Sequence, residues 1–208
     1  MSDLEFPDTE SLADLQRFAT LARQVDADAA LRLLAVGEVL ATYACVVPGR
    51  GLTGAGAVLG LRTYRLGAPH TVDVTVPAAA VLDRIARVAG SSGTSLPIPP
   101  MSAFVAWAAV SPPRSGWTPA GSLDSTLLLE TARTGITALG SQGSGMAAAL
   151  ESARAQVWSA PIAGTEAPAG LAFGAYALRF LTPGGEASLW RSGAWWRLST
   201  PAGHVLAH

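Results

Sequence analysis

The segment Gly49–Gly54 fits the pattern G-x-G-x-x-G, which in dinucleotide-binding proteins joins a strand to a helix and holds a phosphate. Asp73 follows about 20 residues later, near the spacing at which such proteins bind a ribose. That chemistry also needs a helix directly after the loop, and residues 58–66 (VLGLRTYRL) have a strand-like pattern instead. We therefore interpret the segment as a Gly-rich connection between strands, where Arg50 can still meet an anion.

A second basic residue stands in a rigid setting. Arg114 lies between two prolines and a tryptophan in PPRSGW (112–117), which is a suitable place to hold an anion or a carboxylate. The alternative interpretation is that this segment fixes a connector across a domain seam. Arg50 and Arg114 are the two predicted anion-binding residues.

Other kinds of catalytic or metal chemistry find little support in the composition. All 14 basic residues are arginine, so a lysine Schiff base and a P-loop lysine are excluded. Cys45 is the only cysteine and lies in an apolar strand, where it is expected to be a small core residue. The histidines His70, His204 and His208 are not joined by a cluster of acids or cysteines. We expect no enzyme activity, no bound metal and no cofactor.

The densest surface pattern is a predicted β-hairpin near the end of the chain. A two-residue turn at Ser192-Gly193 would place Trp190 opposite Trp195. Alternation along the strands then puts Trp190, Trp195 and Arg197 on one face, and this composition is common at the centre of a protein interface. We predict that these three residues bind a partner. The alternative is that both faces of the hairpin are covered within the domain.

The N-terminal part has the pattern of an α+β layer, with an antiparallel sheet and two helices. The first helix should begin near Asp8, which can cap it, and end around 25–28. A tight turn is expected at Gly37-Glu38. The predicted strands are Ala30–Val36, Val39–Val47, Val58–Leu66 and Thr71–Val76, and the second helix is Ala78–Ala89.

The C-terminal part should contain three helices and the hairpin. The domains are predicted as 1–92 for the sheet, 93–121 for a packed connector rich in Pro and Trp, and 122–208 for the rest. The helices are expected over Asp124–Leu139, from Ser144 to just before Pro161, and over Pro168–Leu181; the strands are Ala187–Arg191, Ala194–Ser199 and His204–Ala207.

Several strings together resemble a family of uncharacterised proteins from actinobacteria. They are PGRGL (48–52), VLGLRT (58–63), VDVTVP (72–77), PPRSGW (112–117) and RLSTPAGHVLA (197–207). The resemblance spans most of the chain and implies no activity, ligand or site residue. The C-terminal element order also resembles a winged helix. The chain departs from that pattern at the third helix, whose only charged residue is Arg179, because a recognition helix needs polar side chains for base edges.

Three functions are consistent with these observations. The first is a non-enzymatic interaction or oligomerisation protein that uses the hairpin surface, with a protein partner or a second copy in a homodimer. The alternative is a winged-helix DNA-binding regulator with Arg179, Arg191 and Arg197 on phosphates. The third is a binder of a small anion or nucleotide at the Gly-rich loop.

Charge and hydropathy bear on the partners and the location. The net charge of -1 gives no general attraction to nucleic acid, which is therefore a less favoured partner. The acidic N-terminus lacks the features of a signal peptide, and the apolar stretch 29–47 is interrupted by Arg32 and Glu38. We therefore expect a cytoplasmic protein that does not enter a membrane.

Overall fold

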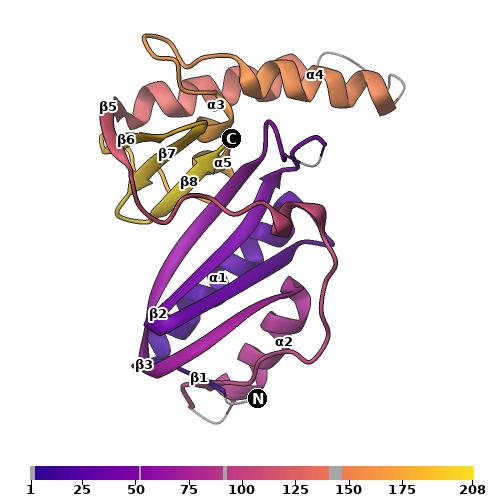
Figure 1. Cartoon of the computed structure of the whole chain (residues 1–208), viewed down its shortest axis with the longest axis vertical. Coiled ribbons are helices and arrows are strands. Elements are labelled where there is room, and N and C mark those ends of the chain that lie inside the picture. The colour runs from indigo at the N-terminus through magenta and orange to yellow at the C-terminus, as the bar shows by residue number, and fades with distance from the viewer. Residues whose placement is uncertain (1–2, 52, 91–92, 141–146) are drawn as a thin grey trace. The chain divides into compact units, whose positions relative to one another are not determined.

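The structure, a computed structural model, describes residues 3–51, 53–90, 93–140 and 147–208 (Figure 1). The chain divides into two compact units, each built from two stretches of sequence. The first unit is Met1–Val46 with Leu61–Ala109, and the second is Val47–Gly60 with Val110–His208. The tip of one long hairpin is therefore part of the second unit, whereas most of its two strands belong to the first.

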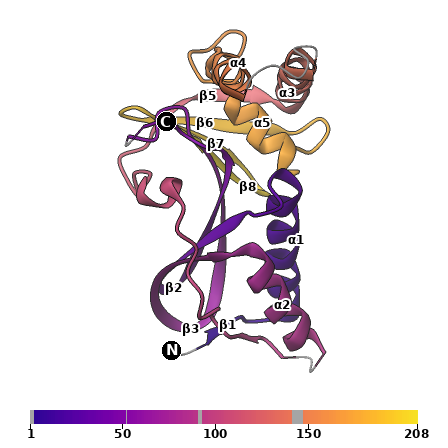
Figure 2. The same ribbon diagram turned by 90° about the vertical axis from the view of Figure 1, so that its right-hand side faces the viewer.

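The first unit contains two helices and two long strands. Both helices lie on the same side of the strands, and they pack against each other (Figure 2). Two short strands, β1 and β4, pair antiparallel. The elements are β1 (Leu4–Glu5), α1 (Thr9–Val25), β2 (Ala30–Val47), β3 (Val58–Pro77), α2 (Ala78–Ala89), β4 (Ser95–Leu96) and the 3-10 turn η1 (Ala106–Ala109).

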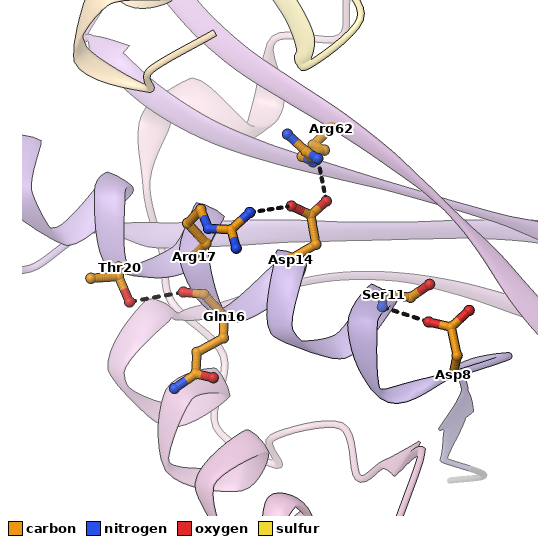
Figure 3. Close-up of polar contacts among 7 residues, drawn as sticks. All are labelled: Asp8, Ser11, Asp14, Gln16, Arg17, Thr20 and Arg62. Atoms are coloured by element: carbon orange, nitrogen blue, oxygen red, sulfur yellow. Dashed lines mark hydrogen bonds and ion pairs between the residues drawn. The ribbon is translucent and has the colours of Figure 1, made fainter.

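The two helices predicted in this part are confirmed. The Asp8 carboxylate caps α1 by accepting a hydrogen bond of 2.6 Å from the Ser11 N–H. On the same helix Asp14 forms ion pairs with Arg17, at 3.3 Å, and with Arg62 of β3 (Figure 3). One carboxylate thus joins α1 to the strand that it covers. The second helix begins directly after Pro77, as predicted.

All residues of the four predicted strands lie in strands, which are joined in pairs into two longer elements. The structure has two long strands, and the predicted turn at Gly37-Glu38 lies inside β2. Gly37 has a φ of +61°, and Val36 and Val39 beside it are 59% and 52% exposed. The buried positions of β2 are odd-numbered from 31 to 35 and even-numbered from 40 to 46, and residues 36–39 between them are exposed. This change of phase is the pattern of a two-residue reversal at Gly37-Glu38.

Asp73 is part of a structural ion pair and is not a free polar residue. Its two carboxylate oxygens accept hydrogen bonds of 2.8 Å from Nε and Nη2 of Arg32, so β2 and β3 are joined by a two-point contact. Arg32 Nη1 also donates to the Ala108 carbonyl oxygen at 3.1 Å.

The second unit contains three helices and most of a sheet. Six strands are hydrogen-bonded in the order β2-β3-β8-β7-β6-β5, and β5 to β8 pair antiparallel with one another. The predicted start of the middle helix at Ser144 lies outside the described residues. The elements are β5 (Thr118–Asp124), α3 (Ser125–Gly140), α4 (Ala147–Ser159), α5 (Gly170–Ala177), β6 (Glu186–Ser192), β7 (Trp195–Thr200) and β8 (Gly203–Ala207).

The last helix is shorter than the predicted 168–181. It ends because Arg179 takes a left-handed conformation, with a φ of 54°. The Arg179 N–H donates to the Tyr176 carbonyl oxygen at 3.1 Å, and the Phe180 N–H donates to that of Ala175 at 2.8 Å. These two bonds form a Schellman cap, a motif in which glycine is the usual left-handed residue. Because an arginine occupies that position here, the end of the helix is not evident from the sequence.

Trp158 of α4 joins the three helices of the second unit. Its ring stacks on Phe173 of α5 with 4.3 Å between centroids and an interplanar angle of 10°. Gly135 of α3 faces the same indole so closely that an added Cβ would lie 2.3 Å from Cζ3. The helices can approach in this way only because α3 has no side chain at position 135. None of the helices in the described residues is both long and apolar enough to cross a membrane.

Replacing a helical glycine with alanine usually stabilises a helix, and the contact with Trp158 should reverse that effect at Gly135. Gly135→Ala should lower the free energy of unfolding by about 1–3 kcal/mol, because the new methyl group overpacks the Trp158 ring. The control is Gly140→Ala at the end of α3, where an added Cβ meets nothing within 4 Å. It should leave stability unchanged or raise it by up to about 1 kcal/mol. Chemical denaturation of both variants is the measurement, and equal effects would contradict this packing.

Candidate functional site

The hairpin is present, but its predicted pairing is wrong. Trp190 lies opposite Arg197, not Trp195, because the turn falls at Gly193-Ala194. Gly193 has a φ of +58° and Ala194 does not have a positive φ, which fits a type II′ turn with glycine as its first central residue. Because the turn is displaced by one residue, each residue of β6 pairs with the residue two positions further along β7 than predicted. The predicted division of side chains between the two faces is therefore retained.

One face of the sheet packs on the helices. Leu189, Leu198 and Val205 lie on it and are each no more than 2% exposed. Val205 is so close to α5 that a Cβ added to Gly174 would lie 2.6 Å from its Cγ1. This apolar layer fixes the direction in which the other face points.

On the opposite face an arginine lies between two tryptophans. The Arg197 guanidinium carbon is 4.7 Å from the ring centroid of Trp117 and 5.1 Å from that of Trp190. Trp117 is held in place by its Nε1–H, which donates to the Pro113 carbonyl oxygen at 3.0 Å. Sequence reasoning placed Trp117 only in the packed connector.

Trp195 is on this face too, but it is not available as a contact surface. It is 7% exposed, and its ring lies 4.8 Å from that of His208. The prediction grouped it with Trp190 and Arg197 because alternation gives the face of a residue and not what covers it. The partner-binding role of the group remains a prediction.

The Arg197 side chain has unused hydrogen-bonding capacity. Its Nε is buried and has no hydrogen-bond partner among the described residues. Burial lowers the pKa of this guanidinium from its ordinary value, and no acid contributes to the shift. The cation is therefore stabilised by the faces of two aromatic rings and not by a carboxylate.

His204 extends the polar part of the same face. It lies opposite Ser199, and its Nδ1 is hydrogen-bonded to the Ser199 hydroxyl at 2.9 Å. Burial, and then the positive charge of Arg197, lower the pKa of His204 below its ordinary value. The imidazole is therefore neutral at pH 7.

The two predicted anion-binding arginines lie in different settings. Arg50 borders a cavity of about 280 Å³ that also contacts Arg154, Trp158 and His208. The last three residues were not predicted as site residues. Arg114 is exposed in the loop before β5. The role of either arginine in anion binding stays a prediction.

The three arginines assigned to phosphate contacts do not form one surface. Arg191 pairs with Trp196, the residue next to Arg197, so Arg191 and Arg197 lie on opposite faces of the hairpin. Arg191 forms an ion pair with Glu166 at 3.0 Å and lies over the Trp196 ring. Arg179 is the cap residue after α5.

Metal and thiol chemistry are not indicated by the geometry. In the part of the chain that the structure describes, no group of three or more His, Cys, Asp or Glu side chains could hold a metal ion. Burial raises the pKa of the Cys45 thiol to about 12. Because the thiolate is the reactive form, this cysteine is a poor nucleophile near neutral pH.

Two family models together cover nearly the whole chain. Residues 1–108 match the domain of unknown function DUF8010, and residues 112–208 match the domain of unknown function DUF8185. The chain belongs to the DUF8010 family. No curated protein matches it.

The fold of this DUF8010 protein resembles that of a sliding clamp. The crystal structure of a DNA polymerase sliding clamp from Pseudomonas aeruginosa matches with a TM-score of 0.51 and 15% identity, over 98% of this chain and 63% of that chain. The DNA polymerase III subunit beta from the same organism has a TM-score of 0.48 and 14% identity, over 100% of this chain and 64% of that one. The chain thus spans less than two thirds of the length of either.

The likeness to a winged helix is wrong. The solved structures named above are sliding clamps, and the hairpin is part of a sheet in which β5 flanks it on one side and β8 on the other. The order of elements along the sequence does not show which strands lie beside the hairpin. Strand β5 was expected to be connector, and its exposed Thr118–Ser122 has no apolar alternation.

The lowered pKa of His204 predicts a loss of stability in mild acid. Between the lowered folded pKa and the ordinary value of 6.5 the unfolded chain binds more protons, so the free energy of unfolding falls as pH falls through this range. His204→Gln should reduce the difference in stability between pH 7.5 and 5.5. Asp8 and Asp124, with pKa values held below 3.8 by hydrogen bonds, titrate outside this window.

Urea denaturation of both proteins at the two pH values is the measurement. Identical pH dependence in the wild type and in His204→Gln would show that His204 does not titrate differently in the folded protein.

Proposed function

We propose that this protein is a non-catalytic protein-interaction protein whose contact surface is the tryptophan–arginine face. We use this name for Trp117, Trp190 and Arg197 on the side of the β5–β8 sheet away from the helices. The observation that carries the proposal is the Arg197 guanidinium, which lies between two indoles without an acid or other hydrogen-bond acceptor among the described residues.

The composition of the face favours recognition of a protein. Tryptophan and arginine are the residue types most enriched among those that dominate binding energy at interfaces. All three side chains are neither fully buried nor fully exposed. They already lie in contact with one another, so little conformational entropy remains to be lost when a partner covers them.

The unsatisfied guanidinium also specifies what the partner must supply. The Arg197 side chain as a whole is half-buried and has no carboxylate partner among the described residues, so an acceptor from a second protein could pair with its guanidinium. A carboxylate would serve best because a charge-assisted bond is stronger than a neutral one. An acidic side chain of a partner, or of a second copy of this chain, is therefore the expected contact.

The fold comparison bears on the architecture of the proposed scaffold. The best of the reported matches is a DNA polymerase sliding clamp, and its low identity supports a similar architecture only. We propose that this chain, like a clamp, serves as a scaffold and not as a catalyst. Trp195, covered by His208, would support the face from beneath without touching the partner.

Two tryptophans on opposite faces of the same hairpin provide a matched test. Trp190→Ala should weaken self-association, or capture of a protein partner, by at least about tenfold, since truncation of a central interface residue commonly costs 2 kcal/mol or more. Trp196→Ala is the control, because Trp196 is also half-buried but lies on the other face. Arg197→Gln should reproduce the effect of Trp190→Ala.

Sedimentation equilibrium would measure self-association, and crosslinking followed by affinity purification would measure partner capture. A monomeric wild type that captures the same proteins as Trp190→Ala would refute the proposal. Equal losses in Trp190→Ala and Trp196→Ala would refute it too, because they would reflect general destabilisation of the hairpin.

A further inference from the structure

The second unit contains a cavity that the proposed function does not use. Its volume is about 280 Å³, just below the usual range of about 300–1,000 Å³ for small-molecule sites. The walls come from three parts of the unit: the loop between β2 and β3, helix α4 and His208 at the end of β8. Val47, Pro48 and Trp158 supply apolar surface, and Arg50, Arg154 and His208 supply polar groups.

The loop is built so that Arg50 is held at the cavity. Its N–H donates to the Ala55 carbonyl oxygen at 2.9 Å, and the Ala55 N–H donates back to the Arg50 carbonyl oxygen at 3.1 Å. The bridge requires glycine on both sides. A Cβ at Gly49 would lie 2.4 Å from the Gly54 carbonyl oxygen, and Gly54 itself has a φ of +68°. The glycines of the G-x-G-x-x-G pattern thus serve a close backbone contact within the loop.

The charges around the cavity are not fully paired within the chain. Arg154 forms an ion pair with Glu151 at 3.0 Å, which also lines the cavity. The exposed Arg50 side chain makes no ion pair or hydrogen bond with the residues that the structure describes. The site therefore has one positive charge in excess among these three groups, and the guanidinium fork matches the oxygens of a carboxylate or a phosphate.

His208 adds a polar group in the wall. Its Nδ1 is buried without a hydrogen-bond partner among the described residues. The ring is held against Trp195, and the backbone is held by the bond from its N–H to the Ala57 carbonyl oxygen at 3.1 Å. A buried nitrogen that the fold leaves unsatisfied is the kind of group that a bound ligand or water satisfies.

We propose that this cavity binds a small organic oxyanion, a phosphate or carboxylate attached to an apolar body. Arg50 and Arg154 hold the oxyanion, and the indole of Trp158 contacts the apolar part. Trp158 is suited to this role because it is fixed by its stack on Phe173 and needs no rearrangement.

Calorimetric titration with three matched probes tests the proposal. Phenyl phosphate and benzoate present the two oxyanions on the same apolar ring, and benzyl alcohol is the uncharged comparison. Saturable binding of at least one anion, at least about tenfold tighter than benzyl alcohol, is expected from a charge-assisted contact. The stronger of the two anions identifies the preferred headgroup.

Single variants locate the binding. Arg50→Gln and Arg154→Gln should each weaken the anion by about tenfold or more while the unfolding midpoint stays near that of the wild type. Arg133→Gln is the control, because it removes the same charge from an exposed position on α3 that does not line the cavity. It should leave the affinity unchanged.

Three results would overturn the proposal. They are no saturable binding of either anion at millimolar concentration, equal binding of the anion and benzyl alcohol, and full affinity in Arg50→Gln. An equal loss in Arg133→Gln would also overturn it, since the interaction would then depend on net charge and not on this site. Binding studied in Trp190→Ala separates the cavity from the tryptophan–arginine face, because that change should not affect the anion.

Discussion

The stack of Trp158 on Phe173 is the contact on which the second unit depends. It joins α4 to α5, and the absence of a side chain at Gly135 lets α3 approach the same indole. A ring held on both sides has little freedom, so it serves as a fixed wall for the cavity beside Arg50 and Arg154. Trp158 thus belongs both to the aromatic core and to the wall of the candidate ligand site.

Much of the local structure follows from sequence patterns, and the reasons are specific. The cap at Asp8 and the proline before Ala78 identify two helices because both signals act within a few residues. Alternation gives the correct faces for Trp190 and Arg197 even though the predicted pairing is wrong, since a displacement of the turn by one residue changes no face. These predictions depend on local rules alone.

The missed features depend on the tertiary environment. Trp195 on β7 is covered by His208, which directly follows β8. The cavity is likewise lined by residues from a loop, from a helix and from the end of the last strand. The Schellman cap at Arg179 was missed because glycine is the expected residue there.

The outer strand of the second unit has a consequence for how the protein behaves at high concentration. Strand β5 is an edge of its sheet, and it contains Pro119 and a register shift between Pro119 and Gly121. Proline offers no N–H to an incoming chain, and an irregular backbone does not match a straight one. This border is therefore a poor template for fibrillar growth, and the sheet is protected against aggregation along it without a covering helix.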